Sequence, residues 1–200
     1  ISGMCMGASV LMSAWYGAGD YETLSRQIST TLLAGCGFSA VFSLLMLFLA
    51  RPVLVLIQVP EDVMGEAVSY LRVIFLGLIF TFIYNFLANT MRALGDSKTP
   101  LYFLMISAFF NVAGDLLLVA VFGMGVFGSA VSTVASEALS CLFCAVYIKK
   151  RIPLLCLGKK WLVFDRSLLG RTVSYGSTSA LQQVCLQIGK VIIQSVINTQ

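Results

Sequence analysis

Six stretches of the chain are long and apolar enough to cross a lipid bilayer as helices. A helix needs about 20 mainly apolar residues to span the hydrocarbon core. Strands are disfavoured, because membrane barrels alternate apolar and polar residues whereas these runs are apolar on all sides. The pattern predicts an all-α polytopic membrane protein with six transmembrane helices. The expected spans are residues 1–18, 28–50, 67–91, 101–122, 126–148 and 173–197.

The overall composition supports this fold class and excludes several others. Hydrophobic residues make up 58% of the chain and charged residues 11%, whereas an ordinary soluble domain carries about 25% charge. The chain is also too apolar to stay disordered in water. It has no histidine, which removes Ser-His-Asp triads, HExxH zinc sites and imidazole relays. We therefore expect no catalytic residues and no enzyme activity.

The chain starts at Ile1 and ends just after an apolar stretch, so we expect an internal part of a longer protein.

Lysine and arginine placement predicts the orientation in the membrane. If the spans alternate in direction, the connections 19–27, 92–100 and 149–172 lie on one side. Ten Lys and Arg residues belong to that side, whereas Arg51 and Arg72 lie toward the other. The basic side is expected in the cytoplasm. Residues 152–171 mix apolar and basic side chains, so they either lie along the inner membrane surface or form a basic loop that only fixes topology.

Two short motifs suggest chemistry but have simpler interpretations. Cys141 and Cys144 form a CxxC inside an apolar run, with no second pair and no histidine, and are expected to pack as small hydrophobic residues. The run 123–128 matches GxGxxG, but it lacks the strand that a dinucleotide site requires. We interpret it as a tight turn between two helices. The glycines expected to permit close helix packing are Gly3, Gly7, Gly35 and Gly37.

Four charged residues fall inside the predicted spans: Arg72, Asp115, Glu137 and Lys190. Such residues are costly in lipid and are functional candidates. Arg72 lies near the end of its helix and can extend to the interface. Lys190 can extend to the interface in the same way, or it faces a polar cavity. Asp115 and Glu137 lie deeper in their helices.

Asp115 belongs to a group of polar residues on two neighbouring helices. Counting inward from the turn at 123–125 puts Asp115 level with Thr133, and Asn111 level with Glu137. Carboxylate, amide and hydroxyl oxygens are ligands for hard cations such as Na⁺. A buried carboxylate can also carry a proton, and Asn and Thr alone can act as hydrogen-bonding glue between helices. Glu137 is either a coupling residue or a protonated packing partner.

Several strings of residues resemble one transporter family. They are Ser13–Asp20, Pro60–Met64, Met91–Pro100 (MRALGDSKTP), Asn111–Asp115 (NVAGD) and Phe122–Val134. Together they resemble the multidrug and toxic compound extrusion (MATE) transporters along nearly the whole chain. The resemblance implies that the six spans are helices two to seven of a twelve-helix, two-lobe transporter. Residues 1–148 would form the first lobe without its first helix, 149–172 a cytoplasmic basic linker, and 173–200 the first helix of the second lobe.

The resemblance also implies a site and a function. The family's cation site in the first lobe corresponds to Asn111, Asp115 and Thr133, with a further aspartate on the first helix, which this chain lacks. Glu137 stands where the family more often has glutamine. The seventh helix lacks both the usual proline and the membrane glutamate of one subgroup. With Glu137, the further candidates for coupling or for lining a cavity are Lys190, Gln182 and Gln183.

We therefore expect a secondary active efflux transporter that exchanges a cationic, amphipathic small molecule for Na⁺ or H⁺. The alternatives are a lipid-linked oligosaccharide flippase of the same superfamily and an integral membrane enzyme. The expected partners are the bilayer and a drug-like substrate, with no nucleic acid and a monomeric full-length protein. The expected location is the plasma or inner membrane. No cofactor or metal is expected beyond the coupling ion, Na⁺ or H⁺.

Overall fold

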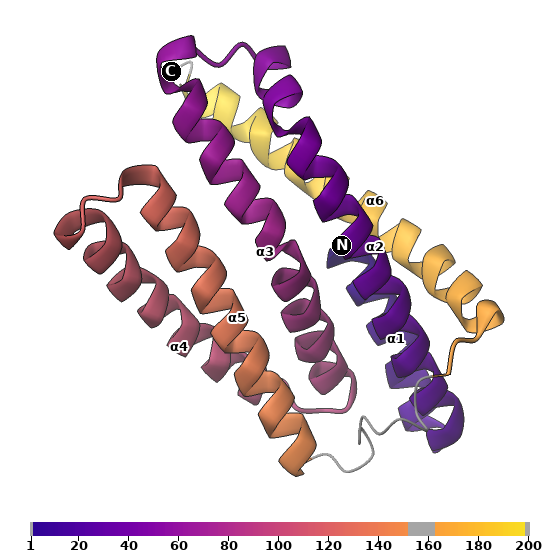
Figure 1. The fold of residues 1–200 in the computed structure, drawn as a ribbon. Helices are drawn as coiled ribbons and strands as arrows, with labels where there is room; N and C mark the ends of the chain where they lie inside the picture. The colour runs from indigo at the N-terminus through magenta and orange to yellow at the C-terminus, as the bar shows by residue number, and fades with distance from the viewer. Residues whose placement is uncertain (1, 152–162, 199–200) are drawn as a thin grey trace.

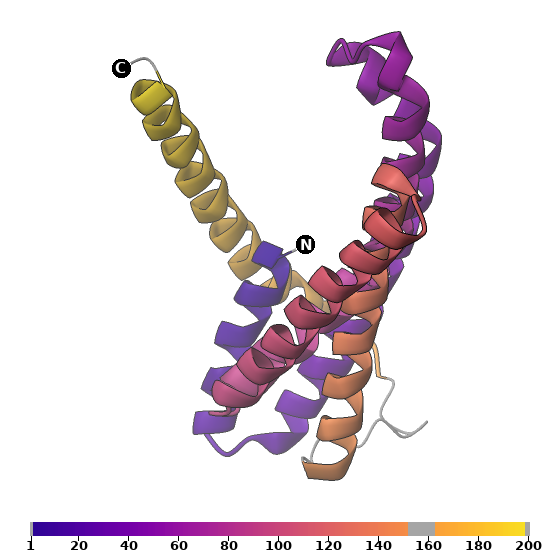
Figure 2. The same cartoon turned by 90° about the vertical axis from the view of Figure 1, so that its left-hand side faces the viewer.

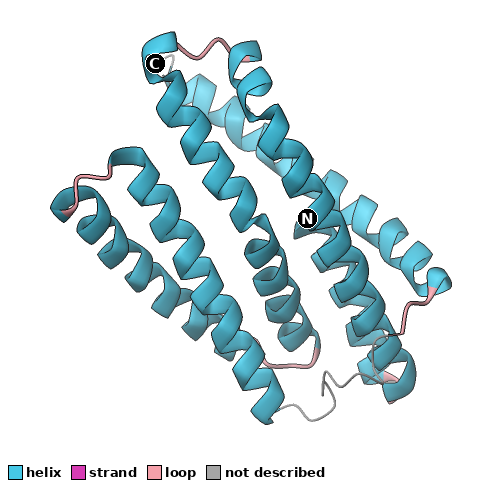
Figure 3. Ribbon diagram, in the orientation of Figure 1, coloured by secondary structure: helices cyan, strands magenta, loops and turns pink. Residues whose placement is uncertain are grey.

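The computed structural model of the protein describes residues 2–151 and 163–198. That part of the chain consists of helices joined by short connections, with no strand (Figure 3). The helices are α1 (Ser2–Gly17), α2 (Tyr21–Leu56), α3 (Glu61–Ala93), α4 (Lys98–Asp115), the π-helix η1 (Leu116–Val121), α5 (Gly125–Arg151) and α6 (Arg166–Asn198) (Figure 1). The all-α fold expected from the sequence is confirmed.

The helices are longer than the predicted spans. Residues 21–27, expected in a loop, form the first turns of α2, and α6 begins at Arg166 rather than near residue 173. Apolar run length marks only the part of a helix that lies in hydrocarbon, whereas the helix itself continues into the polar region. Among the described residues, four segments are long and apolar enough to span a membrane: α2, α3, Lys98–Val121 and α5. The 36 residues of α2 rise about 54 Å, well beyond a bilayer core of about 30 Å.

The bundle has two ends, which we name by their charge and position. The basic end carries the α1–α2 and α3–α4 connections, the last turn of α5 with Lys149, Lys150 and Arg151, and the start of α6. The far end carries the α2–α3 and α4–α5 connections (Figure 1). Adjacent helices in the chain therefore run in opposite directions from α1 to α5, as expected for a polytopic bundle.

Three aspartates begin helices at the basic end. The Asp20 carboxylate accepts a hydrogen bond from the Thr23 backbone N–H at 3.0 Å, and Asp165 accepts from Ser167 and Leu168 at 2.9 and 3.3 Å. Asp96 accepts from the Thr99 N–H at 3.1 Å, whereas Ser97 makes no side-chain capping bond. The cap is Asp96, because its carboxylate reaches a free N–H of the first turn.

The buried core lies toward the basic end. Its fully buried side chains come from α1, α2, α3 and α5, and include Met12, Leu24, Phe82, Met91 and Cys144. Toward the far end α6 diverges from α2 and α3, so that the helices form a V in side view (Figure 2). Outside the core, many large apolar side chains are exposed, such as Phe48 at 75% and Phe109 at 72%. Extended exposed apolar surface of this kind is suited to contact with lipid.

Small residues set the closest approach between helices. A Cβ on Gly7 would overlap the backbone of Gly176, and a Cβ on Gly3 would come within 2.6 Å of the Ala180 Cα. Both pairs join α1 to α6. Gly35 likewise faces the Phe82 ring, whereas nothing lies near Gly37. The close-packing prediction is thus confirmed for Gly3, Gly7 and Gly35 and wrong for Gly37, which is exposed.

Polar residues hold the start of α6 against α2. Gln27 donates to the Thr172 hydroxyl at 2.5 Å and to Thr31 at 3.0 Å. Ser29 and Thr30 bind the chain just before α6, accepting from the Val163 and Asp165 backbone N–H groups at 3.0 Å each. We call these residues of α2 and the segments that they bind the basic-end clasp. Of the amphipathic stretch expected at 152–171, residues 152–162 lie outside the described residues.

The structure also bears on the two short motifs. The described cysteines, Cys141 and Cys144 among them, are free thiols, and Cys144 is buried in the core. Gly123 and Gly125 have φ of +64° and +57°, a conformation that glycine adopts without steric cost. The tight interhelical turn is confirmed, and Cys144 packs in the core as expected, whereas Cys141 is only partly buried.

Candidate cation site

The α4–α5 hairpin brings Asn111 into contact with the polar residues of α5. The Asn111 side-chain amide donates to the Thr133 hydroxyl at 3.3 Å and to Ser132 at 3.4 Å. Ser132 in turn donates to the Asn111 backbone carbonyl at 2.8 Å. Gly114 permits this approach, since a Cβ there would come within 2.5 Å of the Ser132 oxygen. Asn111 and Thr133 therefore form a preformed pair of neutral oxygen-bearing side chains.

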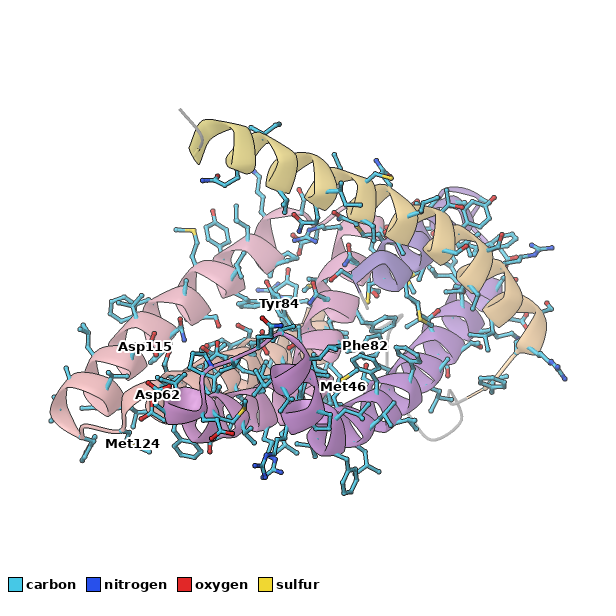
Figure 4. The ribbon with its side chains drawn as sticks, turned by 90° about the horizontal axis from the view of Figure 1, so that it is seen from above. Met46, Asp62, Phe82, Tyr84, Asp115 and Met124 are labelled. Atoms are coloured by element: carbon cyan, nitrogen blue, oxygen red, sulfur yellow. The ribbon has the colours of Figure 1, made fainter. Side chains whose placement is uncertain are left out.

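Asp115 lies one turn beyond Asn111, at the end of α4. It lines an open cavity of about 490 Å³ together with Tyr70 of α3 and Ser129 of α5. Figure 4 shows it on the α4 side of the molecule, away from Phe82 and Tyr84 near the middle. Its Oδ1 atom is buried and has no hydrogen-bond partner among the described residues. A buried, unpartnered carboxylate oxygen is costly, and it calls for a ligand or a proton.

A π-helix begins directly after Asp115. Residues 116–121 form η1, and the chain then turns at Phe122–Met124. Segments of π-helix are rare and often accompany functional sites. A π-helix has wider turns than an α-helix and rises less per residue, so Asp115 lies closer to the far end than a count of α-helical residues gives. Ser129, four residues into α5, is its neighbour in the cavity.

This geometry corrects the predicted register of the hairpin. We had expected Asp115 to be level with Thr133, and Asn111 level with Glu137. In the structure Asn111 pairs with Ser132 and Thr133, and Ser107 donates to the Ser136 carbonyl at 2.7 Å. The pairing is displaced by about one turn, and the smaller rise of the π-helix accounts for part of this displacement, because the prediction assumed α-helical rise up to the turn. Asn111 and Thr133 thus lie side by side, and Asp115 lies one turn farther along, on a cavity with Ser129.

Glu137 belongs to a different contact from the one expected. Its Oε2 accepts a hydrogen bond from the Thr81 hydroxyl of α3 at 2.5 Å. The side chain is half-buried between α3 and α5. Glu137 therefore lies one turn from Thr133 along α5 and connects the hairpin to α3.

The candidates on α6 lie apart from the hairpin. Gln182 and Lys190 are exposed, while Gln183 donates to the Met6 sulfur of α1 at 3.2 Å. Gln183 also lines a shallow apolar cavity on α6 with Gln187 and Val191. The structure brings none of these three residues to Asp115.

Three residues near the site were not singled out from the sequence: Tyr70, Ser132 and Thr81. Ser132 precedes Thr133 and follows the polar pattern of that helix, so its sequence gives a weak signal. Tyr70 and Thr81 lie on α3 within apolar runs, and only the packing of α3 against α5 reveals their positions. No group of His, Cys, Asp and Glu that could hold a metal ion is found in residues 2–151 and 163–198.

Comparison with known proteins gives a consistent set of matches. A family model described as MatE matches residues 1–117. The probable multidrug resistance proteins YpnP and YoeA of Bacillus subtilis (strain 168) are 31% and 30% identical over 205 and 203 residues. These alignments cover 100% and 98% of this chain but 44% of each relative. The multidrug export protein MepA of Staphylococcus aureus (strain NCTC 8325 / PS 47) is 22% identical over 181 residues, or 90% of this chain and 40% of MepA.

Solved structures share the fold. The inward-facing conformation of a multidrug resistance MATE family transporter superposes with a TM-score of 0.86 at 21% identity, covering 94% of this chain and 43% of that one. The outward-facing conformation of a transporter described in the same words gives 0.87 at 21% identity, covering 98% and 44%. The chain spans less than half the length of the curated relatives and solved structures that it matches. Since the family model covers more than half of the sequence, the chain belongs to the MATE family of multi-pass membrane transporters.

Proposed function

We propose that this chain supplies most of one lobe and part of the next in a two-lobe transporter that exports drug-like, cationic or amphipathic molecules in exchange for Na⁺ or H⁺. Its family consists of transporters and not of enzymes. Relatives of more than twice its length are named multidrug resistance or export proteins. In the proposed arrangement the cation enters the lobe from outside the cell, and the drug leaves as the cation binds.

One observation carries this proposal: the buried Oδ1 of Asp115 has no partner in the described structure. Asp115 lines a cavity with Tyr70 and Ser129, and the Asn111–Thr133 pair lies one helical turn away. A carboxylate supplies the negative charge for a cation, and the Asn111 and Thr133 oxygens supply neutral ligands. Such oxygens are the preferred ligands of hard cations. The Tyr70 hydroxyl, on the same cavity, is a fourth candidate ligand. A proton on the same carboxylate oxygen would remove the cost of the buried charge in another way.

We propose that the protein resides in the plasma or inner membrane with its basic end in the cytoplasm. Ten Lys and Arg residues of the chain belong to that end in the predicted topology, and the positive-inside rule favours this orientation. The cavity at Asp115 then opens toward the outer half of the bilayer. Gln182, Gln183 and Lys190 of α6 would face the substrate path between the lobes, which is consistent with their exposure or lack of deep burial.

The test is drug efflux by the full-length transporter in cells, with Na⁺ and pH gradients varied separately. Asp115→Asn keeps the size of the side chain but removes its charge, so it should abolish cation-driven efflux while leaving the membrane level of the protein intact. Asp62→Asn, at an exposed carboxylate of the far end, is the matched control and should transport normally. Normal efflux by Asp115→Asn would overturn the proposal. The gradient that drives the wild type identifies the coupling ion.

A further inference from the structure

Glu137 lies at one end of a line of polar side chains, spaced about one turn apart, that runs along α3 to the basic end. Thr81 donates to Glu137 at 2.5 Å. The Asn85 side-chain amide donates to the Thr81 carbonyl at 2.8 Å, and that of Asn89 donates to the Asn85 carbonyl at 2.8 Å. Arg92, at the surface, donates to the Asn89 side-chain oxygen at 3.5 Å. None of these side chains is fully buried, so each keeps some access to its surroundings.

In the other direction, the candidate cation site lies within two helical turns of Glu137. Glu137 lies one helical turn from Thr133, and Thr133 accepts a hydrogen bond from Asn111, one turn from Asp115. On α3 the line runs from Thr81 to Arg92. These two residues are 11 positions apart, which corresponds to a rise of about 16 Å, or about half of a hydrocarbon core of about 30 Å. The polar groups on α3 therefore lead from the level of Glu137 to the basic end.

No charged side chain of the helices packed against α5 lies close to Glu137, so its carboxylate can bind a cation. The charged side chains of the helices packed against α5 are Arg72 and Arg92 on the two sides of Thr81 in α3, three acids in the first turns of α3, and Lys98 and Asp115 in α4. All are more than two turns from the level of Glu137. Nearer titratable groups along the same helices are Tyr84, which donates to the Pro100 carbonyl, and the Cys141 thiol. Within the described residues the only ion pair is Arg26–Glu22, so Glu137 has no cationic partner there.

We propose that Glu137, with Thr81, Asn85 and Asn89, forms the path by which the coupling cation leaves the Asp115 site for the cytoplasm. This inference rests on the proposed function, because it assigns the exit of the ion that Asp115 binds. A carboxylate inside the membrane is costly, and carboxylates found there mark ion or proton pathways. Hydroxyl and amide oxygens at one-turn intervals supply successive ligands for Na⁺, or anchor the waters that pass a proton.

The experiment reconstitutes the full-length transporter in liposomes and measures exchange of external cation for the cationic dye ethidium. Separate arms use a Na⁺ gradient at constant pH and a pH gradient without Na⁺. Equilibrium binding of the same cation to the purified protein is measured in parallel. The variants are Glu137→Gln, Asn85→Leu and Thr81→Val. The matched control is Ser69→Ala, since Ser69 lies on α3 and donates to the carbonyl four residues back, as Thr81 does, but bonds no other helix.

Each variant on the path should slow exchange by about tenfold, or about 1.4 kcal/mol of added barrier, while cation affinity changes little. Ser69→Ala should exchange at the wild-type rate. Wild-type exchange by both Glu137→Gln and Asn85→Leu would overturn the inference, and would leave the proposed function standing if Asp115→Asn is inactive. Normal exchange by Asp115→Asn would instead overturn the proposed function. If Glu137→Gln fails to fold, Asn85→Leu decides the result alone.

Discussion

The side-chain amide of Gln27 in α2 donates a hydrogen bond to the hydroxyl of Thr172 in α6 at 2.5 Å, across 145 residues of sequence. Both side chains are fully buried. Around them Ser29 and Thr30 bind the backbone that leads into α6. This basic-end clasp holds α6 where the bundle is closed, whereas the far ends of the helices diverge (Figure 2). A transporter that opens at the basic end would have to break it.

Thr172→Val should lower stability by about 1–3 kcal/mol, since it leaves a buried amide without one of its partners. Gln27→Leu combined with Thr172→Val should recover part of that loss, because replacing both partners by apolar groups avoids the unsatisfied donor. Thermal unfolding of the full-length protein in detergent measures both effects. Thr178→Val is the control, since Thr178 bonds only to the Ser174 carbonyl of its own helix. A double variant less stable than Thr172→Val alone would contradict this account of the clasp.

Gly7→Ala should disrupt the contact between α1 and α6. A methyl group at Gly7 would overlap the backbone of Gly176, which cannot rotate away as a side chain can. Overpacking of this kind costs about 1–3 kcal/mol. Gly17→Ala in the same helix has open space around it and should leave the unfolding temperature unchanged. Equal unfolding temperatures for the two variants would show that the approach of these helices is not tight.

Asp96 should make the basic end sensitive to acid. Burial tends to raise the pKa of Asp96, but the hydrogen bonds from Thr99 and Tyr147 outweigh it and hold the pKa below its ordinary value. The stabilisation by the ionised carboxylate is therefore complete above the unfolded pKa of about 4. It is lost as the pH falls through the lower folded pKa.

Asp96→Asn should thus unfold at a lower temperature than the wild type near pH 7, and the difference should shrink below about pH 4. Tyr147→Phe removes one of the hydrogen bonds to Asp96 and should give a smaller effect with the same dependence on pH. Unfolding temperatures measured across this range check both variants. A constant difference between Asp96→Asn and the wild type at all pH values would refute the proposed role of the charge.

The CxxC pair should have no redox or metal role. Cys144 is fully buried in the core and Cys141 is partly buried, and both are free thiols. Cys144→Ser should destabilise the protein more than Cys141→Ser, because it places a hydroxyl group in an apolar core. Transport by Cys141→Ala should be unaffected by reductants and chelators. Loss of transport on chelation in the wild type, but not in that variant, would reveal a metal role that packing does not predict.

Much of the fold follows from the apolar run lengths and the turn residues. A run of about 20 apolar residues can satisfy its backbone in lipid only as a helix, and this made the four described spanning segments predictable. The clasp was not predictable in the same way. In the sequence, Gln27 ends a predicted connection, and Ser29 and Thr30 begin the next predicted span. Only the path of the whole chain brings them to their partners, which are Val163, Asp165 and Thr172.

The candidate site shows the same division between local and tertiary information. The contact between Asn111 and Thr133 was within reach of the sequence, because a tight turn joins their two helices. Their register was displaced, because a π-helix after Asp115 leaves no clear mark in the run LLLVAV. The partner of Glu137 was missed because Thr81 lies on α3, which packs against α5 without being next to it in sequence.

Direct cation binding to the purified full-length transporter tests the central claim, that Asp115 is the ligand of the coupling ion. Calorimetric titration with Na⁺ at fixed pH, and the uptake of protons on adding acid in the absence of Na⁺, would be compared between the wild type and Asp115→Asn. The account predicts that the cation binding seen in the wild type disappears in Asp115→Asn, while thermal unfolding shows the variant to be folded. Unchanged binding of both cations by folded Asp115→Asn would contradict it.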